Sequence, residues 1–380
     1  MDRRSHAIDS LRGVAILLVL LHHQSFVLTA THDISWSGVD LFFVLSGYLV
    51  TGLLLREQAK YGATDVSRFL IRRGFKIYPA FWVMIAATVV FSFAAQRPVS
   101  GKAMLFELVF LQNYGPGLWA STWSLAVEEH FYFAIALLFI YLNHRRGPLD
   151  VRTVTRWALF ALVAVLASRC LTVATIPTHY KLTYWGTHVR VDALICGALI
   201  AFWQMNARRQ LAAFVTGHSF QIAFASVVLL AISFATYHIE PVRMTIGFTL
   251  TYLAYAGVLL LVLHHAEPDG LVTRVLAGIG RYSYGIYIWH LPLLALILPL
   301  VKKKLGISET IPGSPALTYF FEAIVGGIAL SQAIEFPFLR LRDRWFPSRA
   351  GIPAQVHAQG APWRPFGRRT GARSNRGNLA

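Results

Sequence analysis

The feature that most constrains this chain is a series of apolar runs, each close to the length of a membrane span. They lie near residues 11–30, 38–56, 75–95, 123–142, 156–175, 188–205, 219–237, 244–264, 283–300 and 316–338. A helix of about 20 apolar residues crosses the ~30 Å hydrocarbon core of a bilayer and satisfies its own backbone hydrogen bonds. The runs lack the alternation of β-strands. The sequence therefore predicts an all-α transmembrane bundle of about ten helices.

The composition supports a membrane protein. Of the 380 residues, 56% are hydrophobic and 14% are charged, whereas a soluble domain carries about 25% charged residues. Basic residues gather in alternate short loops, which is typical of cytoplasmic flanks. This pattern predicts a multi-pass protein of the cytoplasmic (inner) membrane with both termini in the cytoplasm, although the Lys302–Lys304 triplet argues the other way.

The net charge of +17 does not indicate nucleic-acid binding. Attraction of the basic loops to anionic lipid accounts for it, and the sequence has no RNA- or DNA-binding motif. We therefore expect membrane lipid, and no nucleic acid, as a partner. Cys170 and Cys196 lie in apolar runs without the spacing of a metal-binding pair, so no metal site is predicted.

One transmembrane domain is expected, over residues 1–346, followed by a basic tail at 347–380. The tail is rich in Pro, Gly, Arg and Ser and has no acidic residue, which predicts a disordered cytoplasmic segment. Residues 104–113 are apolar but too short for a span, and we expect a re-entrant or interfacial piece there. The string from His264 to Gly270 matches short motifs of soluble condensing and of glycerolipid acyltransferases, but its position is typical of a helix end and turn.

Arg12 and His23 mark the polar positions of the first apolar run. Eleven steps of 100° bring them within about 20° of one helix face, roughly 16 Å apart along the axis. Ionisable side chains are costly in lipid, so both should face the protein interior or a wet cavity. His22 points about 80° away from that face. The pair predicts either a functional site or a helix end anchored by Arg with a structural histidine.

A polar stripe marks the span near 123–142. Ser124, Glu128 and Tyr132 recur every four residues, whereas Glu129 lies on an apolar face of the same helix. Glu128 should therefore face the interior. A carboxylate there is either a proton acceptor or the partner of a buried His or Arg.

Two further polar residues are expected at a similar depth. Ser46 belongs to a small-residue patch where another backbone or a ligand can approach closely. His290 follows helical spacing in the span near 283–300, and Pro292 should bend that helix beside it. Together with His23 and Glu128, they approach one depth from opposite membrane faces, which predicts a shared cavity.

Several charged residues near the membrane surfaces admit two interpretations. Arg68 and Arg72 stand one turn apart on a short cytoplasmic helix, where they suit either a phosphate-rich ligand or lipid head groups. Arg190 and Asp192 begin the span near 188–205 and either pair with each other or touch a polar substrate. Asp40 is expected at the membrane interface.

Seven short segments of this chain resemble the integral-membrane acyltransferase-3 family. They are Arg12–His23, which matches the family's Arg-x(10)-His signature, and Gly38–Tyr48, Arg68–Pro79, Trp123–Tyr132, Arg190–Leu194, Tyr282–Pro292 and Ile334–Pro337. They follow one another in order across all of the chain but the tail. His130 departs from the family pattern, because a Gln is more usual there.

The resemblance implies an enzyme that moves an acyl group, commonly acetyl, from a coenzyme A thioester to a hydroxyl, usually on a glycan or lipid-linked sugar. It implies that His23 is the catalytic base and that Arg12 is its companion. It also implies that Arg68 and Arg72, with the adjacent Arg73, bind acyl-CoA on the cytoplasmic side.

In the mechanism expected from these residues, Glu128 holds His23 in the tautomer that removes the proton of the acceptor hydroxyl. Ser46, Tyr287 or His290 would donate hydrogen bonds to the oxyanion. The alternative is a polytopic transporter or flippase that uses the buried His and Glu as a proton relay. An inactive scaffold is a third interpretation. The sequence shows no inverted repeat of the kind that transporters carry.

Overall fold

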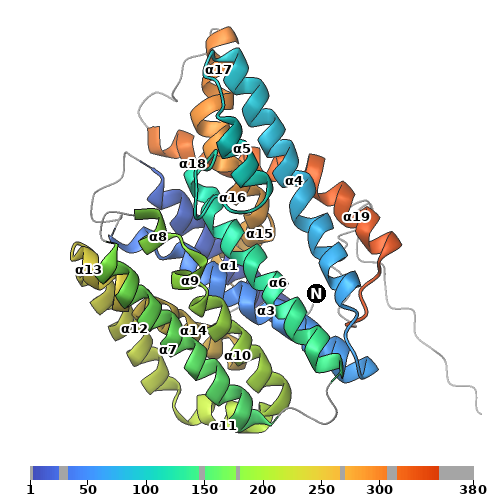
Figure 1. Cartoon of the computed structure of the whole chain (residues 1–380), viewed down its shortest axis with the longest axis vertical. Helices are drawn as coiled ribbons and strands as arrows, with labels where there is room; N and C mark the ends of the chain where they lie inside the picture. The colour runs from blue at the N-terminus through green and yellow to red at the C-terminus, as the bar shows by residue number, and fades with distance from the viewer. Residues whose placement is uncertain are drawn as a thin grey trace, which may run out of the picture.

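All regular structure in the described part of the chain is helical. The computed structural model describes residues 3–24, 33–144, 150–176, 180–265, 270–305 and 315–350. No strand occurs among them, which confirms the predicted all-α class (Figure 1). The string from 266 to 269 and most of the predicted tail, 351–380, lie outside the described residues.

Within the described ranges, eight helices are long and apolar enough to cross a membrane. They are Asp33–Tyr61, Val66–Ala94, Ala120–His144, Val151–Thr175, Lys181–Asn206, Glu240–His264, Ser283–Lys304 and Ala316–Trp345. The helices α11 (Arg208–Gly217) and α12 (Ser219–Ala235) meet at 76° and add a ninth if they form one broken span. The multi-span architecture is confirmed, whereas the exact count and the orientation stay predictions.

The first helix differs from its predicted bounds. Helix α1 runs from Arg3 to His22 instead of from 11 to 30. His23 therefore directly follows the last residue of this helix. Its backbone N–H still donates to the carbonyl of Val19 at 3.3 Å. Residues 25–32 lie outside the described ranges.

Helix α3 (Gly38–Tyr61) packs closely on α10 (Asp192–Asn206), as Figure 1 shows. A Cβ on Gly47 would lie 2.0 Å from the carbonyl oxygen of Leu194, and one on Gly197 would lie 2.0 Å from that of Val44. Only glycine allows these backbones to approach so closely. The small-residue patch beside Ser46 therefore serves helix packing, one of its two predicted uses.

The other elements that build the core follow in chain order. They are α4 (Val66–Ala94), α5 (Gly101–Leu108), η1 (Ala120–Thr122), α6 (Trp123–His144), α7 (Val151–Thr175), α8 (Tyr180–Tyr184), α9 (Thr187–Arg190), α13 (Glu240–Val242), η2 (Arg243–Gly247), α14 (Phe248–His264), α15 (Leu271–Arg281), α16 (Ser283–Pro292), η3 (Leu293–Ile297), α17 (Leu298–Leu305), α18 (Pro315–Leu330), η4 (Ser331–Glu335) and α19 (Phe336–Trp345). At eight residues, α5 is too short to span, as predicted. Directly after Pro292 the chain turns π-helical, so the expected irregularity lies beside His290.

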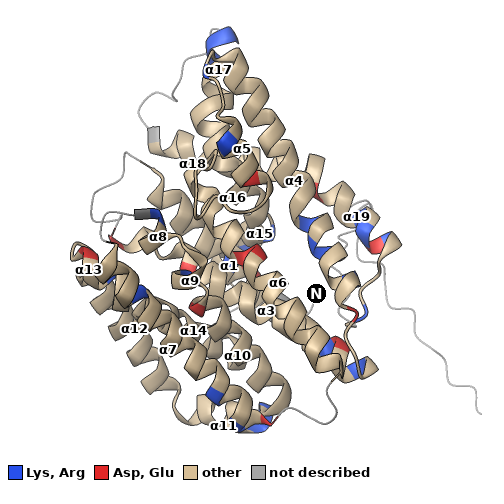
Figure 2. Ribbon diagram, in the orientation of Figure 1, with Lys and Arg blue, Asp and Glu red and all other residues tan. Residues whose placement is uncertain are grey.

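Positive charge collects at the ends of the bundle. Figure 2 shows Lys and Arg at the ends of α3, α4 and α11 that lie on one side, and the lysines of α17 at the opposite end of the molecule. The basic ends of α3, α4 and α11, which the sequence predicts on one side of the membrane, therefore also lie on one side of the molecule.

Candidate active site

Two imidazoles meet where α1 ends beside α16. The ring centroids of His23 and His290 lie 4.9 Å apart, in an edge-on arrangement. His290 is fully buried. The ring of His22 lies 5.4 Å from that of His23, so this residue also belongs to the cluster despite its different helical phase. The structure thus brings together the two histidines that the sequence predicts to share a cavity.

Backbone carbonyls fix the tautomers of both histidines. The Nδ1 atom of His23 lies 2.9 Å from the carbonyl oxygen of Val19, and that of His290 lies 2.6 Å from the carbonyl oxygen of Tyr287. A carbonyl only accepts, so each Nδ1 carries the proton and each Nε2 of the neutral ring carries the lone pair. Nε2 of His290 is buried with no hydrogen-bond partner among the described residues. Two neighbouring rings, those of His23 and His290, therefore each carry a lone pair on Nε2.

Glu128 lies in a hydrogen-bonded group of its own. The hydroxyl of Tyr132 donates to the Glu128 carboxylate, and Oγ of Ser46 lies 2.7 Å from the Tyr132 oxygen and 3.3 Å from Glu128 Oε2. The predicted convergence of Ser46 on Glu128 is therefore confirmed. The predicted mode of tautomer control is wrong, because the Val19 carbonyl, not a carboxylate, accepts from Nδ1 of His23.

Tyr287 links these two groups. Its ring lies 6.0 Å from that of His290, and its hydroxyl donates to the carbonyl oxygen of Ser121 at 2.6 Å. Because the only proton of this hydroxyl is donated to Ser121, its oxygen accepts a hydrogen bond from the hydroxyl of Ser124. Ser124 lies one turn before Glu128 on α6. The polar stripe of α6 therefore faces the histidine cluster, as its spacing predicts.

The three expected oxyanion donors are already engaged. The Ser46 hydroxyl donates within its contacts to Tyr132 and Glu128. The Tyr287 hydroxyl donates to the carbonyl oxygen of Ser121, and Nδ1 of His290 donates to the carbonyl oxygen of Tyr287. In this arrangement, the side-chain donors that the sequence nominates for an oxyanion all stabilise the site itself.

Arg73 lies apart from Arg68 and Arg72. Its guanidinium carbon sits 4.6 Å above the ring centre of Tyr132, within the carboxylate group. One residue along a helix turns the side chain by 100°, which carries Arg73 away from the face of Arg72. The positive charges of Arg73 and Arg12 both attract the carboxylate of Glu128. Arg12 also forms an ion pair with Asp9 at 3.6 Å. Of the three arginines predicted to bind acyl-CoA, Arg73 therefore faces the Glu128 group instead of the face that carries Arg72.

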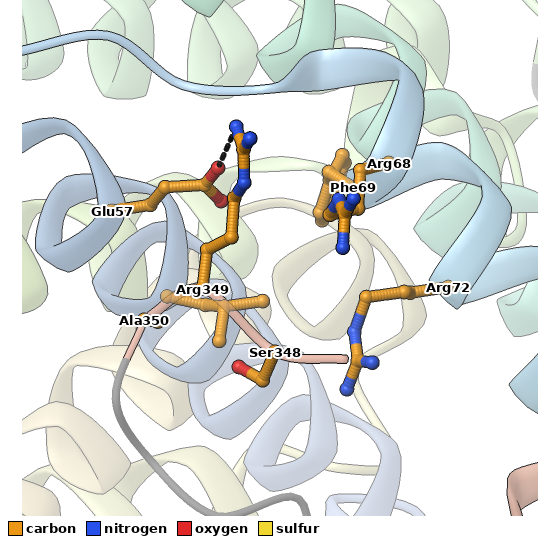
Figure 3. Close-up of a pocket in the computed structure, with 8 residues that line it drawn as sticks. Glu57, Arg68, Phe69, Arg72, Ser348, Arg349 and Ala350 are labelled. Carbon is orange, nitrogen blue, oxygen red and sulfur yellow. Dashed lines mark ion pairs between the residues drawn. The ribbon is translucent and has the colours of Figure 1, made fainter. Parts of the chain in front are cut away.

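Arg68 and Arg72 face the segment that follows α19. Arg68 Nη1 donates to the carbonyl oxygen of Pro347 at 3.1 Å, and Arg72 donates to that of Phe346. Arg72 also pairs with Asp343 at 3.1 Å. Figure 3 shows the pocket that these arginines line.

The interpretation of Arg190 and Asp192 is corrected. Arg190 pairs with Asp40 at 2.9 Å, and Asp192 pairs with Arg169 at 2.7 Å. All four side chains are buried, so Asp40 faces the protein interior. The Arg190 guanidinium also lies 3.6 Å over the ring centre of Phe248. This network is a part of the core rather than a contact surface for substrate.

Sequence reasoning also missed buried polar groups. Glu129, expected on an apolar face, is buried and accepts a hydrogen bond from Tyr78 at 2.9 Å. Lys76 pairs with buried Glu335 at 3.6 Å. Each is an ionisable residue in an apolar run, and that is the signal that could have drawn attention to it.

The fold and the site define a polytopic helical membrane protein with a two-histidine centre and a half-buried carboxylate. The profile of the acyltransferase domain family Acyl_transf_3 matches residues 5–336, and the chain belongs to this family. The resemblance seen in the sequence is thereby confirmed. No solved structure matches the chain.

Curated relatives carry related names. The chain is 29% identical over 327 residues to peptidoglycan O-acetyltransferase OatA of Listeria monocytogenes, covering 78% of this chain and 50% of that protein. It is 29% identical over 326 residues to putative peptidoglycan O-acetyltransferase YrhL of Bacillus subtilis, covering 77% and 49%. It is 24% identical over 374 residues to O-acetyltransferase OatA of Staphylococcus aureus, covering 91% and 58%. The chain thus spans about half of the length of these relatives.

Proposed function

We propose that this chain is a membrane-embedded O-acyltransferase that moves an acyl group, with acetyl as the first choice, from cytoplasmic acyl-CoA to a hydroxyl of a glycan or lipid-linked sugar. The observation that carries the proposal is the fixed tautomer of His23, whose Nδ1 donates to the Val19 carbonyl and whose Nε2 holds the lone pair beside His290. A general base needs such a lone pair held in place. The names of two relatives, which say peptidoglycan, support a glycan acceptor.

The proposed reaction needs one proton acceptor and no metal. Nε2 of His23 takes the proton of the acceptor hydroxyl as its oxygen attacks the thioester carbonyl carbon. The tetrahedral intermediate then loses its carbon–sulfur bond, and the protonated imidazole returns the proton to the leaving thiolate. The products are an ester and free CoA, and His23 is neutral again because it has passed the proton of the hydroxyl to the thiolate. The part of the chain that the structure describes holds no group of residues suited to a metal ion.

Arginines are proposed to bind the donor. Arg68 and Arg72 at the end of α4 would contact the phosphates of acyl-CoA through paired N–H groups. The positive charges of Arg12 and Arg73 would instead attract the carboxylate of Glu128. The helix end with these arginines would face the cytoplasm, in a cytoplasmic membrane, with both termini and a basic tail at 347–380 on the same side.

Membranes from cells that express the chain should test this proposal. Incubated with acetyl-CoA labelled in the acetyl group, they should transfer label into glycan in an ester that mild base removes. Membranes with His23→Ala should not. A transporter or flippase would leave glycan unlabelled while moving a substrate across the membrane, and that result would overturn the proposal.

A further inference from the structure

The segment after α19 lies over the arginines at the start of α4. Residues 346–350, here called the cover segment, close the pocket between α3 and α4 that Figure 3 shows. One side of this pocket is lined by residues of α3 and α4, namely Leu53, Glu57, Arg68, Phe69 and Arg72. The other side is lined by Ser348, Arg349 and Ala350 of the cover segment. The cover segment therefore forms a wall of the pocket in which the arginines lie.

Its backbone occupies the guanidinium groups. The carbonyl oxygens of Phe346 and Pro347 accept from Arg72 and Arg68, and the Asp343 carboxylate pairs with Arg72. These acceptors use N–H groups that a phosphate would need. A charged phosphate oxygen is a stronger acceptor than a neutral carbonyl oxygen, so it can replace the carbonyls once the segment moves.

An ion-pair clasp closes the cover segment. Nη1 of Arg349 lies 3.5 Å from the carboxylate of Asp65 and 3.9 Å from that of Glu57. The Arg349 side chain is 43% exposed, and ion pairs of exposed side chains contribute little to stability. The clasp is therefore weak enough to open.

The closed pocket is too small for a nucleotide. Its cavity volume is only about 10 Å³. Pockets for drug-sized ligands hold about 300–1,000 Å³, and CoA is larger than such ligands. A phosphate-bearing ligand can reach both arginines only if the cover segment leaves.

We infer that the cover segment is an intramolecular competitor of acyl-CoA, held by the Arg349 clasp, and that donor binding displaces it from Arg68 and Arg72. The ring of Phe346 lies 5.9 Å from that of Phe75 on α4, so this side chain anchors the segment while the backbone from the Phe346 carbonyl to residue 350 swings away. Because closed molecules do not bind, the apparent Kd for CoA exceeds the intrinsic Kd by the inverse of the open fraction. This inference rests on the proposed acyl-CoA donor.

Cysteine accessibility tests the displacement directly. Ser348→Cys is introduced into the full chain with Cys170→Ser, since Cys170 is exposed and Cys196 is buried. Added CoA should increase the rate of labelling by a charged maleimide several-fold, and CoA without its 3′-phosphate should increase it less. The matched control is Arg344→Cys on exposed α19, whose labelling should not respond to CoA.

A binding measurement separates the inference from the proposal beneath it. In titrations of the solubilised full chain, Arg349→Ala should lower the apparent Kd for CoA by about threefold, and Arg349→Lys should stay near wild type. If CoA binds but neither the Ser348→Cys labelling nor the Arg349→Ala affinity changes, the cover segment is no competitor and this inference alone fails. If CoA binds to none of these proteins, the acyl-CoA donor itself is wrong.

Discussion

His290 presents a buried Nε2 beside the ring of His23, with 4.9 Å between the ring centroids. Because its Nδ1 donates to the Tyr287 carbonyl, neutral His290 is an acceptor at Nε2 and not a donor. A buried acceptor without a partner is costly. In the proposed reaction, the glycan hydroxyl would donate to it, or the His23 imidazolium that would form when this hydroxyl loses its proton.

This relationship predicts that the two variants His290→Gln and His290→Phe differ. Phe keeps the ring volume but removes the acceptor, and kcat should fall by about 5-fold to 150-fold. Gln can offer an oxygen near the Nε2 position and should retain more activity. Steady-state rates with labelled acetyl-CoA provide the measurement. Equal losses in both variants, with normal thermal unfolding, would refute an acceptor role.

Removing the hydroxyl of Tyr132 should weaken the carboxylate group. Tyr132→Phe takes away the donor to Glu128, so that only the 3.3 Å contact from Ser46 remains. A hydrogen bond to a charged group contributes about 1.5–3 kcal/mol. We expect a lower midpoint of thermal unfolding in detergent, together with reduced transfer. The control is Tyr141→Phe on the same helix, where the side chain is 63% exposed and should tolerate the change. Equal stability of the two variants would contradict this account.

Breaking the Arg190–Asp40 pair should affect stability more than any surface change. Arg190→Met leaves the Asp40 carboxylate buried without its partner, and such single removals cost about 3–5 kcal/mol. The double variant Asp40→Asn with Arg190→Met removes both charges and should recover part of that loss. Denaturation of the solubilised variants measures both. A double variant less stable than the single one would show that the pair does not act as a unit.

Glu107 on α5 gives a pH-dependent prediction outside the spans. Burial raises the pKa of this carboxyl above its ordinary value of 4.5, although hydrogen bonds from Thr122 and the N–H of Leu118 oppose the shift. A raised folded-state pKa favours the protonated form, so stability should fall as the pH rises from 4.5 through the folded-state pKa. Glu107→Gln keeps an acceptor for Leu118 and should remove this dependence. The exposed control Glu240→Gln should retain it.

Helical spacing predicted much of the site. The interval of four residues placed Ser124, Glu128 and Tyr132 on the inner face of α6, and the depth of His23 and His290 predicted their meeting. The same 100° rotation per residue places Arg73 on a different helix face from Arg72. The prediction grouped the two arginines because they share a motif and did not consider which face each one occupies. Local geometry along one helix is thus readable from sequence.

Partners that are distant in the chain could not be predicted in this way. Asp40 and Arg190 are 150 positions apart, and an even longer stretch of the chain separates Arg349 from Glu57. Nothing in either local sequence selects the other. Arg169 offered one usable signal, since an arginine within an apolar run must find a buried partner.

The central claim is that His23 is the general base. The most direct test measures transfer of labelled acetyl from acetyl-CoA to glycan in membranes that contain equal amounts of wild type, His23→Ala or His22→Ala. Loss of a general base lowers rates by about 10²–10⁴-fold, so His23→Ala should be inactive on this scale while the protein still inserts, and His22→Ala should keep most of its activity. Wild-type turnover in His23→Ala would contradict the account.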